Sequence, residues 1–234
     1  MINLSKSRHQ ISKGFTLIEL LISISILSLL LFTGSYSYSL MSTRWNKELG
    51  QFSTTAKIAK HLELTQRVLE GIQSHIVVDK TKKPYFFFIG HQNSLLAVSQ
   101  AGLFSGYFPE IFRLTVLEKS TGLVDLVYQS VSSESVLLTN TEQQIDFSKN
   151  IILFSDMEQI KFEYFGWKNY NEKTDDESNN YKESWHSNYS GIDRQYTPSK
   201  LRLTIVNSGH ALVIPVELQV DVEKQLSPYF NSDS

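Results

Sequence analysis

A long apolar run near the N-terminus constrains this chain more than any other feature. From Phe15 to Thr43 the only charged side chain is Glu19. A helix rises about 1.5 Å per residue, so the run comes close to spanning the roughly 30 Å of a bilayer's hydrocarbon. It therefore predicts a transmembrane helix over residues 15–40. The carboxylate needs a compensating cation, because a charge at the centre of a membrane helix costs about 2.5–3.5 kcal/mol.

The flank before this run is basic. It contains no acid and three cations, namely Lys6, Arg8 and Lys13, which predicts a cytoplasmic N-terminus and a C-terminal part across the membrane. A cleaved secretory signal is the alternative, since it also places an apolar segment after a basic one. Thr33-Gly34-Ser35 offers a small-residue cleavage site for it. Three details count against that alternative: Gly14 precedes the run, the run is long, and it contains an acid.

The segment from Lys13 to Glu19 reads Lys-Gly-Phe-Thr-Leu-Ile-Glu. It resembles the class III signal of type IV prepilins and of type II secretion pseudopilins. The resemblance implies cleavage after Gly14 by a prepilin peptidase and N-methylation of Phe15. The new amine on Phe15 is cationic at neutral pH, because α-amines have a pKa near 8. The resemblance further implies that Glu19 pairs with the N-terminal amine of a neighbouring subunit. The alternative for Glu19 is a carboxylate that is tolerated near the membrane interface.

Composition excludes several classes of function. The chain contains no cysteine, which excludes disulfides, thiolate zinc sites and thiol catalysis. Its formal net charge is −2, from 22 Lys and Arg against 24 Asp and Glu. Cleavage of residues 1–14 removes three of these cations and no acid, which leaves 19 against 24 and a side-chain charge of −5. This balance argues against a nucleic-acid partner.

Helical periodicity continues beyond the apolar run. Apolar residues recur every three or four positions at Trp45, Leu49, Phe52, Ala56, Ala59 and Leu62. We expect the helix to extend to about residue 70, because no Pro occurs between residues 15 and 83 and Gly71 suits a helix end. Its first half is expected to lie in lipid or in a filament core. Its second half is expected to pack, through this stripe, on the chain's own domain.

From residue 84 the pattern changes to the two-residue period of strands. Short β-rich runs occupy residues 85–89, 95–98, 112–117, 123–128, 151–154 and 160–164. The clearest alternation runs from Leu212 to Val222, and residues 201–205 are its hairpin partner across the turn Asn207-Ser208-Gly209. Pro215 indicates an edge strand, because it has no backbone N–H to donate. The predicted fold class is α+β, a long helix packed on antiparallel sheets in a β-rich body over residues 84–226.

A polar loop over residues 167–197 interrupts the strand pattern. Its aromatic side chains Trp167, Tyr181 and Trp185 are candidate partner contacts. The alternative is that they only hold the loop against the sheet. The acids of the loop are weak Ca²⁺ candidates, because Ca²⁺ prefers carboxylate oxygens but the run lacks EF-hand spacing. These acids are Asp175, Asp176 and Glu177.

The body of the chain resembles the J-type minor pseudopilins of type II secretion. This resemblance rests on Phe162-Glu163-Tyr164, on Trp167 and Trp185, and on residues 198–204. The chain departs from that pattern by a longer polar insertion after Trp167, and the W-type minor pilins of type IV pili are close competitors. The resemblance implies I- and K-like partner subunits and a tip complex that initiates filament assembly. It also implies contact with an inner-membrane assembly platform.

The sequence contains no enzymatic motif. Its six histidines form no HExxH pattern or other close pair. The serine between Gly102 and Gly106 is one position late for a nucleophile elbow, and no phosphate-binding glycine loop occurs. We therefore expect no catalytic residue, no metal and no cofactor.

Together these patterns predict three segments. They are a cleaved leader over residues 1–14, a transmembrane or filament-core helix over 15–40, and a periplasmic pilin-like domain over 41–234. The predicted function is a non-catalytic minor pilin or pseudopilin, single-pass in a bacterial inner membrane before it enters a filament. The alternative is a tip-displayed binding module that contacts an exported substrate or a surface.

Overall fold

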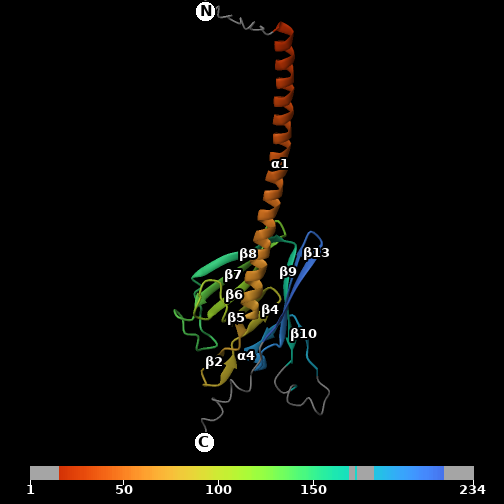
Figure 1. Cartoon of the computed structure of the whole chain (residues 1–234). Coiled ribbons are helices and arrows are strands. Elements are labelled where there is room, and N and C mark those ends of the chain that lie inside the picture. The colour runs from red at the N-terminus through yellow and green to blue at the C-terminus, as the bar shows by residue number, and fades with distance from the viewer. Residues whose placement is uncertain (1–15, 169–171, 173–181, 219–234) are drawn as a thin grey trace, which may run out of the picture. The chain divides into compact units, whose positions relative to one another are not determined.

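The computed structural model describes residues 16–168, 172 and 182–218, with residues 50, 51, 53 and 54 described by their backbone alone. The chain divides into two compact units, residues 1–56 and residues 57–234. They are called unit 1 and unit 2 below. Helix α1 (Leu17–Glu70) contributes to both, and the strands all belong to unit 2 (Figure 1).

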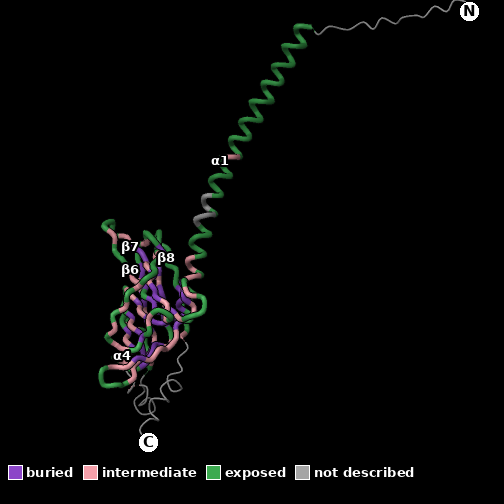
Figure 2. Tube along the Cα trace, turned by 90° about the vertical axis from the view of Figure 1, so that its left-hand side faces the viewer, coloured by how far each residue is buried: buried purple, intermediate pink, exposed green. Residues whose placement is uncertain are grey.

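The described part of unit 1 is an exposed apolar helix. Among the described residues, one helix, over Leu17–Leu49, is long and apolar enough to cross a membrane. Figure 2 shows this stretch as exposed along almost all of its length. Four of its hydroxyl groups donate to the carbonyl four residues earlier, at 2.7–2.9 Å, namely those of Ser23, Ser25, Thr33 and Thr43. These bonds satisfy polar groups that hydrocarbon cannot solvate.

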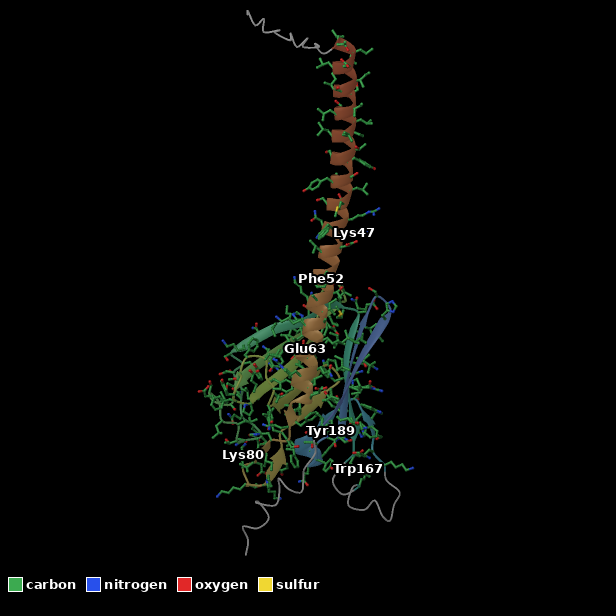
Figure 3. All side chains as sticks on the ribbon, in the orientation of Figure 1. Lys47, Phe52, Glu63, Lys80, Trp167 and Tyr189 are labelled. Carbon is green, nitrogen blue, oxygen red and sulfur yellow. The ribbon has the colours of Figure 1, made fainter. Side chains whose placement is uncertain are left out.

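The apolar stripe on α1 extends over both units. Trp45, Leu49 and Phe52 are exposed, and Phe52 is labelled in Figure 3. In unit 2, by contrast, Val68 and Leu69 are buried in the core. Trp45, Leu49 and Phe52 belong to unit 1, so the packing of this first half of the stripe on the chain's own domain stays a prediction. Periodicity identifies which face of a helix is apolar, but not where that face meets another element.

Unit 2 is built on a seven-stranded antiparallel sheet. Its strand order is β11-β4-β5-β6-β7-β8, with β1 also paired to β5. The bounds in chain order are Ile72–Gln73 (β1), Ile89–His91 (β4), Ser94–Ser99 (β5), Glu110–Glu118 (β6), Val124–Ser132 (β7), Lys149–Met157 (β8) and Tyr189–Ser190 (β11). The four strands β5 to β8 are neighbours both in sequence and in the sheet (Figure 1).

A four-stranded antiparallel sheet is the second layer. Its strand order is β10-β9-β12-β13, with bounds Ser184–His186 (β10), Gln159–Gly166 (β9), Lys200–Asn207 (β12) and His210–Glu217 (β13). A separate pair joins β2 (Ile76–Val78) to β3 (Pro84–Phe86). The run predicted as one strand over residues 85–89 is thus divided between β3 and β4.

The predicted C-terminal hairpin is confirmed as far as residue 217, and residues 219–222 of its predicted second strand lie outside the described residues. Asn207 pairs with His210, so the turn consists of Ser208 and Gly209. Both have positive φ, 51° and 72°, as a type I′ turn requires, and this turn matches the twist of the two strands. Pro215 lies on β13, which is an edge strand, so no neighbour needs the N–H that Pro lacks.

The main core lies between the two sheets and the C-terminal end of α1. Buried side chains come from α1 (Val68, Leu69), from the seven-stranded sheet (Leu95, Phe112, Leu114, Leu126) and from the four-stranded sheet (Phe162, Tyr164, Leu201, Leu203). A second cluster, which includes Val98, Ile111 and Val131, is packed with Phe87 and Leu138. The seven-stranded sheet therefore contributes to two clusters. The predicted α+β layout, a long apolar helix followed by antiparallel sheets, is confirmed.

The interval predicted as a polar loop supplies strands to both sheets. Within residues 167–197, β10 pairs with β9, and β11 pairs with β4. The short helix α4 (Gly191–Arg194) follows β11, and its N-cap is Ser190, whose side chain accepts from the Asp193 N–H. These elements hold the buried Tyr189 in the core.

Candidate functional site

Glu19 closes the N-terminal end of α1. Its Oε2 accepts hydrogen bonds from the Thr16 N–H at 3.0 Å and from Thr16 Oγ1 at 2.9 Å, while the Glu19 N–H donates to Thr16 Oγ1 at 3.4 Å. This reciprocal arrangement is a capping box, which arises where Thr is followed three residues later by Glu. The carboxylate thereby lies at the positive end of the helix dipole.

The capping box stabilises the Glu19 carboxylate through hydrogen bonds within its own chain. Sequence reasoning treated Glu19 as an isolated carboxylate and missed Thr16, although the Thr-x-x-Glu spacing was a readable signal. Thr16 donates to only one carboxylate oxygen, and among the described residues no hydrogen bond reaches Oε1. The predicted cleavage residue Gly14 and the predicted methylated Phe15 lie outside the described residues.

Trp185 lies on the solvent face of the four-stranded sheet. It is on β10 and is 41 % exposed. The Arg202 guanidinium carbon lies 4.2 Å from the centre of its ring, and the Phe165 ring is 5.2 Å away. Arg202 in turn donates to both oxygens of Glu163, at 2.8 and 3.0 Å. This hydrogen-bonded pair lowers the pKa of Glu163 below its usual value and fixes the guanidinium over the indole.

Trp167 has a different environment. It packs against a small buried cluster formed by Phe86 and Tyr196, and its carbonyl accepts from Arg194 Nη1 at 3.0 Å. Figure 3 labels both Trp167 and Tyr189, whose ring lies 4.3 Å from the same guanidinium. Trp167 thus holds local structure together, while Trp185 faces solvent. Tyr181, the third predicted aromatic contact, lies outside the described residues.

A polar cleft of about 680 Å³ opens between the two sheets. It is lined by the turn between β4 and β5, the hairpin of β6 and β7, and the start of β9, including His91, Asn93, Glu118, Glu158 and Lys161. Within the described ranges, no group of three or more His, Cys, Asp or Glu could hold a metal ion. The weak Ca²⁺ candidates Asp175, Asp176 and Glu177 lie outside those ranges.

The comparison with family models identifies the N-terminal segment. Residues 10–34 match the model described as the prokaryotic N-terminal methylation motif. No curated protein matches the chain. The motif supports a type IV pilin-like protein, and it implies processing by a prepilin peptidase and assembly with other pilins in the membrane. The single apolar helix of α1 fits membrane anchoring of such a subunit.

Proposed function

We propose that this protein is a minor pilin or pseudopilin, a non-catalytic subunit of a type II secretion pseudopilus or a type IV pilus. The match of residues 10–34 to the methylation motif carries the proposal. The exposed apolar helix supports it, because such a helix needs lipid or neighbouring helices around it. In this proposal the leader over residues 1–14 stays cytoplasmic until cleavage, and unit 2 lies in the periplasm.

The J-like body suggests a finer role. We propose that the subunit joins I- and K-like partners in a tip complex that initiates filament assembly on an inner-membrane platform. A tip-displayed binding module is the second candidate. It draws support from Trp185, which is partly exposed on the sheet face and held by Arg202 and Phe165. Such rigid aromatic side chains are typical anchors of binding surfaces.

Mass spectrometry of the N-terminus tests the processing on which the proposal depends. The mature chain is expected to begin with N-methyl-Phe15, and Gly14→Leu is expected to leave the leader attached, because the bulky side chain replaces the small residue at the cleavage site. Gly34→Leu is the matched control. A Cβ at Gly34 meets nothing within 4 Å, so this variant is expected to be processed normally. An N-terminus at Ser35, abolished by Gly34→Leu, would instead establish a secretory signal.

A further inference from the structure

A loop with three exposed aromatic side chains joins β5 to β6 in unit 2. Tyr107 is 98 % exposed, and Phe104 and Phe108 are 46 % and 45 % exposed. No Asp, Glu, Lys, Arg or His occurs from Gln100 to Pro109. At about 200 Å² for a whole aromatic side chain, these three expose roughly 400 Å². That area matches the largest apolar patches of ordinary monomers, which commonly mark interaction sites.

A buried carboxylate fixes the backbone of this loop. Glu110 is 1 % exposed, and it accepts from the N–H groups of Leu103 at 3.2 Å, Phe104 at 2.7 Å, and Ser105. Tyr128 donates its hydroxyl to the same carboxylate at 2.6 Å. Burial, together with this hydrogen bond, raises the pKa of Tyr128, so its hydroxyl remains a donor at neutral pH.

The hydrogen bonds that Glu110 accepts from the loop and from Tyr128 are called the Glu110 cradle below. This cradle explains how the loop stays ordered while its aromatic side chains are exposed. Three successive N–H groups donate to Glu110 and fix the backbone at Phe104, while Tyr107, three residues later, is almost fully exposed. Gly102 packs so closely against the Glu110 carboxyl group that no Cβ fits there. Because the backbone is already fixed, a partner that binds the aromatics pays little of the usual cost of ordering a loop.

The loop lies at one defined end of unit 2. The Gln100 N–H donates to the Gly71 carbonyl at 2.8 Å, which places the start of the loop beside the C-terminal end of α1. The segment of α1 from Lys57 to Glu70 rises about 20 Å. The loop therefore lies at the end of unit 2 opposite Lys57, the residue at which the unit begins.

We propose that residues 103–108 form a docking element for a different pilin-type subunit, which offers an uncharged apolar pocket. This inference rests on the proposed function. An uncharged pocket is required, because an ionised group buried against this loop would find no counter-charge in it. The exposed aromatic area of roughly 400 Å² is about half of what each partner buries in a standard interface. A second contact must therefore hold the partner nearby, and a shared membrane anchor provides such a contact.

The cavities described in unit 2 do not suit a second copy of this chain as the partner. The cleft between the sheets is lined mainly by polar side chains. The void beside Phe88 and Leu218 holds about 10 Å³, which is too small for an aromatic ring. On α1 in unit 1, a pocket of about 380 Å³ lies beside Leu40 and Trp45, but the charged Arg44 and Glu48 also line it. None of these three described pockets has the uncharged apolar lining that the loop requires, and we therefore assign the loop to a heterotypic contact.

Site-specific photo-crosslinking tests this assignment. The full chain is produced in its native host with p-benzoylphenylalanine at position 107, irradiated, and the adducts are identified by mass spectrometry. We expect an adduct with a different chain that itself carries an N-terminal methylation motif. Adding Phe108→Ser should lower its yield about tenfold, the effect of losing a typical anchor side chain. The thermal unfolding midpoint should change little, because Phe108 is half-exposed and belongs to none of the three core clusters.

The matched control carries the crosslinker at Val213, an exposed apolar position on β13 of the other sheet. Equal yield at Val213, an adduct with a second copy only, an adduct with lipid only, or no adduct would each overturn the docking assignment. The N-terminus is determined in the same sample. N-methyl-Phe15 without a heterotypic adduct overturns the docking element and leaves the proposed function standing, whereas an unprocessed chain overturns both.

Discussion

At the scale of single residues, Glu19 has one role that the structure shows and a second role that we propose. Its carboxylate caps α1 through Thr16, and in the proposed filament it also neutralises the N-terminal amine of a neighbour. The first role needs only a hydrogen-bond acceptor, since Gln also serves at the third position of a capping box. The second role needs a negative charge.

The pair Glu19→Gln and Glu19→Ala separates these roles. Glu19→Gln keeps the cap and removes the charge, so it is expected to reduce the number of filaments as strongly as Glu19→Ala. Because the chain is proposed to act at initiation, filament length should change less than filament number, as counted by electron microscopy. The control Thr16→Ala weakens the cap, at a cost of about 1 kcal/mol, but keeps the charge. Normal filament number in Glu19→Gln would leave capping as the only role of Glu19.

A second prediction concerns the pH dependence of stability through Glu163. Its pKa is lowered from 4.5 by hydrogen bonds from Arg202, so the pair stabilises the fold at neutral pH. That contribution is lost as the pH falls below about 4.5 and through the lower pKa of the folded state. We expect unfolding experiments to show that Glu163→Gln destabilises the protein at pH 7, and that this effect becomes smaller as the pH is lowered below about 4.5. Arg202→Ala should show the same convergence with wild type, and a difference that stays constant as the pH falls until the protein unfolds would contradict this account.

At the scale of elements, α1 contains an exposed segment and a packed segment with the same apolar pattern. Leu69 is buried in the core of unit 2, and Leu49 is exposed. In chemical unfolding of the detergent-solubilised full chain, Leu69→Ala is expected to cost about 2–5 kcal/mol. Leu49→Ala should change the free energy of unfolding by less than about 0.5 kcal/mol. Both variants replace Leu by Ala within one helix, so helix propensity cancels; equal losses would contradict the assigned packing.

Local rules predicted the elements better than the contacts between them. The hairpin of β12 and β13 followed from alternation and from a turn of two residues, both of which are local properties. The buried part of α1 within unit 2 did not, because Ala59 and Leu69 both follow the helical period, and only Leu69 is buried in the core. The strands β10 and β11 were missed since they contain two or three residues each, too few to show alternation.

The candidate sites differ in the same way: a contiguous motif could be predicted from the sequence, but a site built from distant residues could not. Lys13 to Glu19 was readable because the signal is contiguous, and residues 10–34 match the methylation motif. The cradle around Glu110 was missed, since it depends on Tyr128 from another strand and on three backbone N–H groups. A buried carboxylate of this kind leaves no spacing pattern in the sequence.

At the scale of the whole molecule, the three tryptophans report on different units. Trp167 and Trp185 belong to unit 2, whose two sheets share one core, and Trp45 belongs to unit 1. We expect Trp167→Phe and Trp185→Phe to show the same unfolding midpoint by fluorescence, because a shared core unfolds cooperatively. The double variant Trp167→Phe/Trp185→Phe retains only Trp45, and its fluorescence should show no transition at that midpoint. Different midpoints for the two single variants would mean that the sheets unfold separately.

Four hydroxyl groups along the apolar part of α1 affect the transfer of this helix from a bilayer to a protein interior. Ser23, Ser25, Thr33 and Thr43 each donate to a carbonyl of their own helix. None of these bonds involves lipid, water or another chain, so none has to break when one environment replaces another. These four hydroxyl groups would therefore keep their hydrogen bonds if the helix left a bilayer for a packed protein interior.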